Sequence, residues 1–248
     1  MIGQICIAFI VATIIVCLLF VFSFTKRWDT FRHRLRDLVK PGILLSAAYS
    51  LLKSGDIILS TSNVNGPIIF YWTGTIFAHV SIVVSIKGEL FLLESNRYEP
   101  RHPGPPGINF DGSRLNPLVP RLETINGTLY VAFLNKPLSI EQQYRLTKWA
   151  LHANRHGYEF PSTRSMLARW ITCSRRKPNS YYCFQLAEKT YQKIGLLDGF
   201  PKRSGYFSSA KTICSMIHKR LAGGFSFSPV YRVFCDIGSM RQTIIKHA

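Results

Sequence analysis

Three side chains in this sequence have the types needed for acyl transfer through a thiol: Cys183, His79 and Glu94. A thiolate can attack a carbonyl carbon, an imidazole can carry protons, and a carboxylate can orient the imidazole. The sequence separates these groups widely, so the chemistry depends on the elements that bring them together.

A β-hairpin is predicted to position His79 and Glu94. Residues 78–86 and 89–95 are rich in β-branched and apolar types, and Lys87-Gly88 separates them as a two-residue turn. This turn places Ser81 opposite Glu94 and makes His79 a diagonal neighbour of Glu94, with Cα atoms roughly 7 to 8 Å apart. A polar contact at a sheet edge is the alternative reading of this pair.

Cys183 is predicted to lie in the first turn of a helix that begins at Asn179 or Ser180 and ends before Gly195. Unpaired N–H groups and the helix dipole at such a position favour a thiolate. A buried structural cysteine fits equally well, because one helix face carries apolar and small residues at helical spacing. That face consists of Cys183, Leu186, Ala187, Thr190, Tyr191 and Ile194.

The remaining pattern predicts an α+β domain. A capping box at Ser139 and Gln142 opens a helix that ends near Asn154. Further helices are expected over residues 163–172 and 208–220, strands over 55–60, 128–134 and 225–234, and a long surface loop over 101–120, which is rich in Pro and Gly.

The order of four short segments resembles the circularly permuted NlpC/P60 hydrolases, which are papain-like thiol enzymes. They include the YiiX-like group and poxvirus members, and the lecithin:retinol acyltransferase group is a more distant relative. The resemblance covers about residues 54–200, and it departs from the family pattern at Phe184, where a small or hydroxyl residue is expected after the nucleophile. The matching segments are Ser54-Gly55-Asp56-Ile57-Ile58, Ala78-His79-Val80-Ser81-Ile82-Val83-Val84, Phe91-Leu92-Leu93-Glu94-Ser95 and Tyr182-Cys183-Phe184-Gln185-Leu186.

This resemblance implies a circularly permuted papain-like fold, with an antiparallel sheet packed on helices. It also implies Cys183 as nucleophile, His79 as general base and then acid, and Glu94 as the group that orients His79. The backbone N–H of Cys183 would help to hold the oxyanion. Such sites act on amide or ester bonds through an acyl-thiol intermediate, and neither a cofactor nor a metal ion is expected.

A transmembrane helix is predicted at the N-terminus, because residues 2–24 contain no charged side chain and are long enough to cross a bilayer. A cleaved signal peptide is the alternative, but its basic stretch should come first. The predicted organisation is an anchor over 1–25, a basic connector over 26–53 and a catalytic domain over 54–248. Six basic residues follow the apolar run: Lys26, Arg27, Arg32, Arg34, Arg36 and Lys40.

By the positive-inside rule, this basic flank places the domain in the cytosol or on the equivalent inner side of a virion membrane. Membrane lipids are therefore expected partners, and the substrate is expected to be a lipid, a lipid-linked molecule or a peptide. The sequon at Asn126 matters only if the domain is lumenal.

The formal net charge of +18 also suits nucleic acid, yet the basic residues are spread along the chain without a recognition motif. The sequence therefore does not favour nucleic acid as a partner. The main alternative to an enzyme is a membrane-attached scaffold or binding module that keeps the same fold without catalysis.

Overall fold

The computed structural model describes residues 14–15, 22–23, 26, 42–61, 75–96, 112–125, 127–154, 156–158, 180–198, 212–213, 215–217 and 219–234. Most of the predicted membrane span and basic connector, and all of the helix predicted over 163–172, lie outside these residues. In the described ranges, no helix combines the length and apolar character needed to cross a membrane.

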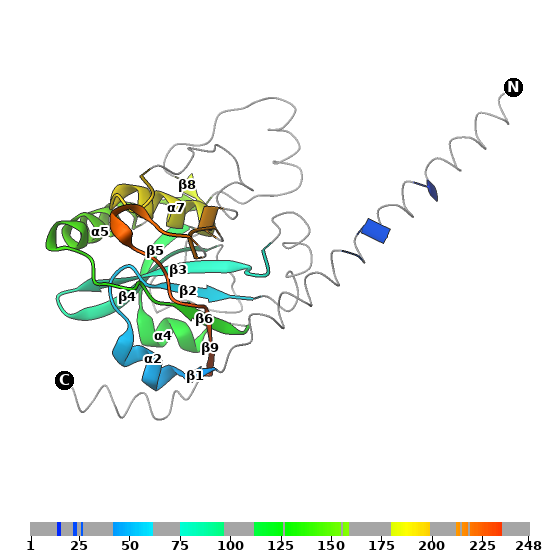
Figure 1. The fold of residues 1–248 in the computed structure, drawn as a ribbon, viewed down its shortest axis with the longest axis horizontal. Helices are drawn as coiled ribbons and strands as arrows, with labels where there is room; N and C mark the ends of the chain where they lie inside the picture. Colours follow the sequence, from blue (N-terminus) through cyan, green and yellow to red (C-terminus); the bar gives the residue numbers. More distant parts are fainter. Residues whose placement is uncertain are drawn as a thin grey trace, which may run out of the picture.

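The described chain forms a mixed α+β fold around one sheet with the strand order β1-β9-β6-β2-β3-β4-β5-β7-β8 (Figure 1). Neighbouring strands are antiparallel, apart from the parallel pairs β1 with β9 and β7 with β8. The strands are β1 (Ile43–Leu44), β2 (Ile57–Ser60), β3 (His79–Ile86), β4 (Glu89–Asn96), β5 (Gly112–Pro117), β6 (Leu129–Ala132), β7 (Gly157–Tyr158), β8 (Ser180–Tyr181) and β9 (Tyr231–Phe234).

Helices cover both faces of this sheet, with α5 and α7 on one side and α2 and α4 on the other (Figure 1). Side chains alternate along β3, so Val80 and Ile82 pack with α5 and α7, whereas Val83 packs with α2 and α4. The central strands are therefore buried on both faces. The helices are α2 (Leu45–Leu51), α4 (Leu118–Glu123), α5 (Ile140–Ala153), α7 (Cys183–Lys193) and the 3₁₀ helix η1 (Ala222–Gly224).

The predicted hairpin register is confirmed. Val83 pairs with Leu92, and Ile86 pairs with Glu89 across the turn. Lys87 and Gly88 both have positive φ, 53° and 86°, as a two-residue type I′ turn requires. Local turn chemistry is sufficient to set this pairing.

The structure confirms the capping box at Ser139, whose side chain accepts from the N–H of Gln142 while the Gln142 side chain accepts from the N–H of Ser139. The helix carrying Cys183 begins later than predicted, because residues 180–181 pair as β8 and Tyr182 is the N-cap. Gly195 follows this helix as predicted, with φ of 76° and the two backbone hydrogen bonds of a Schellman motif.

The surface loop predicted over residues 101–120 is wrong in its second half, where the chain forms β5 and the start of α4. The prolines in this segment suggested a loop, but both are compatible with regular structure. Pro117 ends β5, and Pro120 lies in the first turn of α4, where a missing N–H costs no helical hydrogen bond. Likewise, the strand predicted over 225–234 is regular only in β9.

The sheet also begins before the domain boundary predicted at residue 54. Strand β1 pairs with β9, and the side chains of Leu45 and Ala48 in α2 are buried. Residues 43–51 of the predicted connector are thus part of the folded unit.

Candidate active site

His79 and Glu94 meet in the interior of the sheet. His79 opens β3 and Glu94 lies near the end of β4, and His79 Nε2 lies 2.7 Å from Glu94 Oε2. The hydroxyl of Ser81 donates to the same carboxylate oxygen at 3.2 Å. Both strands have neighbours on each side, and Glu94 is only 1% exposed, so this is no edge contact.

Two further side chains hold the carboxylate of Glu94. Asn116 on β5 donates from Nδ2 to Oε1 at 2.6 Å. Arg121 on α4 donates from Nε to Oε1 and from Nη2 to Oε2, the second at 3.3 Å. A carboxylate that accepts from every side can only be an anion, because a carboxylic acid would have to donate one of these bonds.

Cys183 reaches this pair from the other layer of the molecule. It is the first residue of α7 and is 8% exposed, and its Sγ lies 4.0 Å from the carbonyl oxygen of Ala78, the residue before His79. Its side chain is also close enough to the His79 imidazole to raise the pKa of that ring. Since Nε2 of His79 faces Glu94, Nδ1 is the ring nitrogen that remains for Cys183.

The structure thus brings together all three side chains singled out in the sequence. Glu94 points to the α4 side of the sheet, Cys183 comes from the α7 side, and His79 joins them at the start of β3. The following residue, Phe184, is buried in the core beneath α7.

The electrostatics favour a protonated His79. Burial is the strongest single influence on its pKa and lowers it, but the hydrogen bonds and charges of Cys183 and Glu94 together outweigh burial and raise the pKa to about 9. At neutral pH the imidazole is therefore an imidazolium between two acidic groups.

Glu94 shows the reverse balance. Burial by itself would raise its pKa, yet the charge of Arg121 and the hydrogen bond and charge of His79 lower the pKa below its usual range. Glu94 therefore stays ionised through the neutral range and cannot compete with His79 for a proton.

Ser95, next to Glu94 on β4, connects the same strand to the cysteine side of the site. Its side chain points to the opposite face, where Oγ donates to the carbonyl oxygen of Tyr181 at 2.5 Å. Tyr181 lies in β8, two residues before Cys183. Consecutive residues of β4 thus contact both halves of the site, Glu94 through the imidazole and Ser95 through the backbone that leads into α7.

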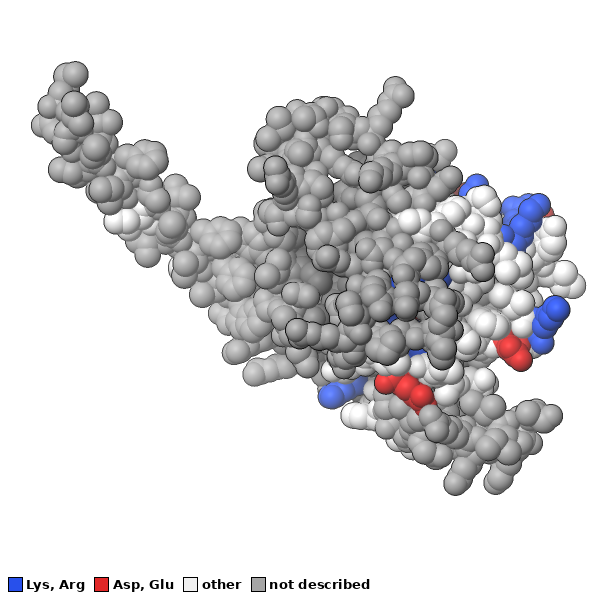
Figure 2. Space-filling model, turned by 180° about the vertical axis from the view of Figure 1, so that it is seen from behind, with Lys and Arg blue, Asp and Glu red and all other residues white. Residues whose placement is uncertain are grey.

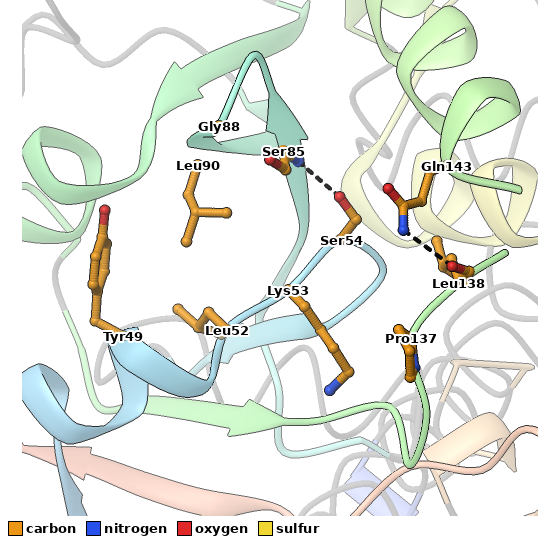
Figure 3. A pocket seen from close by; sticks show the side chains of 10 residues that line it. All are labelled: Tyr49, Leu52, Lys53, Ser54, Ser85, Gly88, Leu90, Pro137, Leu138 and Gln143. Atoms are coloured by element: carbon orange, nitrogen blue, oxygen red, sulfur yellow. Dashed lines mark hydrogen bonds between the residues drawn. The ribbon is translucent and has the colours of Figure 1, made fainter. Parts of the chain in front are cut away.

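A separate pocket of about 370 Å³ lies at the turn end of the hairpin (Figure 3). Ser85, Gly88 and Leu90 line it from the hairpin, and Lys53 lines it from the loop before β2. His79 and Glu94 lie at the opposite end of the same two strands, and neither contributes to this pocket. Its position gives it no direct part in the thiol chemistry.

Metal and charge patterns add little to this picture. The described part of the chain contains no group of three or more His, Cys, Asp or Glu side chains placed to hold a metal ion. On the described surface in Figure 2, Lys and Arg side chains are scattered among uncharged residues and some acidic ones, without a continuous basic patch.

Sequence reasoning missed Asn116 and Arg121, because both lie in the segment predicted as a loop. A usable signal was present: Leu118 and Leu122 are four residues apart around Pro120, which is typical of a short helix with proline in its first turn. Nothing local indicated that the arginine of this helix would face Glu94.

Comparisons with known proteins give a distant likeness. The chain matches no protein-family model, and no curated protein matches it. One similar solved structure is that of the metalloprotein YiiX from Escherichia coli O157:H7, with a TM-score of 0.41 and 18% identity over 72% of this chain and 90% of that chain. A likeness of this size does not bear on the reaction.

Proposed function

We propose that this protein is a thiol hydrolase or acyltransferase of the permuted papain-like type, acting on an amide or ester bond. The observation that carries the proposal is the position of the His79 imidazole, which is hydrogen-bonded to the carboxylate of Glu94 and lies close enough to the thiol of Cys183 for that group to raise its pKa. A buried structural cysteine needs no such partners.

In the first half of the reaction, the Cys183 thiolate attacks the carbonyl carbon and the carbonyl π pair moves to oxygen. The tetrahedral intermediate collapses when the leaving nitrogen or oxygen takes a proton from the His79 imidazolium, which leaves a thioester on Cys183. The raised pKa of His79 makes it the acid in this step and the base in the next.

In the second half, neutral His79 takes a proton from water or from an acceptor hydroxyl or amine, which attacks the thioester. Collapse of this second intermediate releases the acyl product and returns the ion pair. Water makes the protein a hydrolase and another acceptor makes it a transferase.

The start of α7 suits the oxyanion. Cys183 is the first helical residue, so its backbone N–H has no acceptor within the helix. This N–H and the positive end of the α7 dipole would stabilise the oxygen that becomes negative in both intermediates.

Labelling with an electrophilic thioester-forming probe tests the proposal. Peptide mass spectrometry should find the label on Cys183 in the unaltered protein and a loss of about 100-fold or more in His79→Ala, since acid–base catalysis contributes about 10²–10⁴-fold. Cys183→Ala controls for labelling at the other five cysteines. Equal labelling of Cys183 in the unaltered protein and in His79→Ala would support a non-catalytic scaffold.

A pH profile provides a second test. Because the pKa of His79 is raised to about 9, turnover should persist through the neutral range and fall as the pH passes about 9. Loss of turnover near pH 6.5 instead would show that His79 lacks its acidic partners in solution.

We further propose that residues 1–25 anchor the domain in a membrane with the domain on the cytosolic side, which makes a lipid, a lipid-linked molecule or a membrane-proximal peptide the expected substrate. In support, the described apolar residues Ile14, Ile15 and Phe22 have helical backbone and side chains at least 50% exposed. Resistance to alkaline extraction tests the anchor. Glycosylation at Asn126 in cells would contradict the orientation.

A further inference from the structure

The carboxylate of Glu94 is held by three hydrogen bonds on the side that faces away from His79 and Cys183. Arg121 Nε and Asn116 Nδ2 both donate to Oε1, while Arg121 Nη2 reaches Oε2. This fork fixes the plane of the carboxylate and leaves Oε2 directed at His79 Nε2. The orientation of the imidazole thus depends on Arg121, whose side chain is hydrogen-bonded to Glu94 and Thr124.

Arg121 is itself fixed by its own helix end. Its third guanidinium nitrogen, Nη1, donates to Thr124 Oγ1 at 2.8 Å, and that hydroxyl donates to the Arg121 carbonyl oxygen at 2.9 Å. All three nitrogens of the guanidinium are therefore engaged, and the side chain is mostly buried. Such an arrangement holds the fork in one place.

The side chains of Arg121, Glu94, His79 and Cys183 follow one another in a row, and the charges along it alternate in sign. Arg121 is positive, Glu94 negative and His79 positive, the thiol of Cys183 follows, and all four groups are largely removed from water. A second buried cation, Arg114, lies opposite Glu94 in the register of β5 and shares its face. Each charge in a row of this kind offsets the desolvation of its neighbour.

We propose, on the basis of the function proposed above, that Arg121 is a positioning residue that keeps Glu94 ionised and aimed at His79 and thereby keeps Cys183 in its reactive form. Asn116 assists at the same carboxylate oxygen. Without Arg121, burial favours a protonated Glu94, which no longer holds the proton on His79 Nε2. His79 then holds its proton less firmly and gives less support to a thiolate on Cys183.

The experiment measures carboxamidomethylation of Cys183 by iodoacetamide as a function of pH, quantified by mass spectrometry of the peptide that contains Cys183. This readout needs no knowledge of the substrate and follows the thiolate directly. Arg121→Gln should slow alkylation at pH 6 to 7 by about 10-fold or more and move its acid limb up by at least about one pH unit. Arg121→Lys keeps the charge but loses the two-pronged hydrogen bonding, so its alkylation rate should fall between those of the unaltered protein and Arg121→Gln.

Arg145→Gln is the matched control, since Arg145 also pairs with a glutamate, Glu141, but on the exposed face of α5. Its alkylation profile should equal that of the unaltered protein. A purely structural role of Arg121 would lower the melting temperature and leave the profile in place, so thermal unfolding is measured in parallel.

An acid limb that is unchanged in Arg121→Gln would overturn the proposal. If that variant does not fold, unchanged profiles in both Arg121→Lys and Asn116→Leu would overturn it equally. Failure of the proposed function looks different: alkylation of Cys183 in the unaltered protein would then be no faster at neutral pH than that of a free cysteine.

Discussion

Two buried carboxylates, Asp56 at the start of β2 and Glu94 near the end of β4, are both essentially hidden from solvent, at 0% and 1% exposed. Asp56 accepts from backbone N–H groups, Leu134 at 2.7 Å and Lys53 at 2.8 Å. Glu94 accepts from side chains, including the cations Arg121 and His79. The two regions thus share burial but differ in the partners that compensate it.

This difference decides the sign of the pKa shift. Burial is the dominant influence at Asp56 and raises its pKa, despite the backbone hydrogen bonds and the nearby Lys53, whose side chain is 33% exposed. At Glu94, Arg121 and His79 overcome burial and lower the pKa. Backbone amides are therefore sufficient to build a loop around a carboxylate, whereas a carboxylate that must stay ionised beside an imidazole needs buried cations.

The largest expected effect is that of Glu94→Gln. The amide has nearly the same shape but leaves Arg121 without its buried counter-charge, and breaking a buried ion pair costs about 3–5 kcal/mol. Urea unfolding should show this loss, and Cys183 alkylation at neutral pH should fall about 10-fold or more, as for Arg121→Gln. Full stability and unchanged alkylation of this variant would show that Glu94 does not control the protonation of His79.

Asp56→Asn should have a smaller and purely structural effect. One backbone N–H, of Leu134 or Lys53, would face the amide NH₂ instead of an acceptor, at a cost of about 1–3 kcal/mol. Unfolding measurements should detect this loss while Cys183 alkylation keeps its rate and pH profile. A change in that profile would show that the two carboxylate regions are coupled.

At acidic pH, the two carboxylates should change the free energy of unfolding in opposite directions. Glu94 has a lowered pKa, so its contribution is present above about pH 4.5 and lost as the pH falls further. Asp56 has a raised pKa, so its contribution is greatest below pH 3.8 and lost as the pH rises through its folded value. Each proton changes the free energy of unfolding by at most about 1.4 kcal/mol per pH unit.

Urea unfolding at several values between pH 3 and 6 checks this expectation. Glu94→Gln should flatten the loss of stability toward low pH, and Asp56→Asn should steepen it. If both substitutions change the slope in the same direction, the proposed contrast between the two regions is wrong.

The smallest effect is expected for Ser95→Ala, which removes one neutral hydrogen bond to the Tyr181 carbonyl. A cost of about 1 kcal/mol is typical, and Cys183 alkylation should slow by less than about 10-fold if this bond helps to place the start of α7. Ser50→Ala is the matched control, because Ser50 bonds a carbonyl only within the exposed surface of α2. Equal effects of the two would remove any positioning role for Ser95.

Much of the local structure could be predicted from the sequence. The Lys87-Gly88 turn set the register of β3 and β4, and the predicted diagonal contact of His79 with Glu94 is confirmed. The capping box at Ser139 likewise required only residues that are close in the chain. Each of these features is decided by backbone conformation and hydrogen bonds over a few residues.

Predictions failed where tertiary pairing overrides local preference. Residues 112–117 contain Gly and Pro and few strand formers, yet pairing with β4 makes them β5. Residues 180–181 lie in front of a helix and become β8 through pairing with β7. Such strands exist because a neighbour already offers hydrogen bonds, a condition that no window of the sequence reports.

By itself, the sequence determined the chemical types available, the hairpin that joins His79 to Glu94, and the placement of Cys183 at a helix start. Only the tertiary structure decided that Cys183 meets His79 and that Arg121 and Asn116 hold Glu94. Turns and caps depend on interactions between residues that are close in the chain, so the sequence motif alone predicts them. Contacts across the layers form only when the whole sheet and its helices pack, because burial of the core fixes those distances.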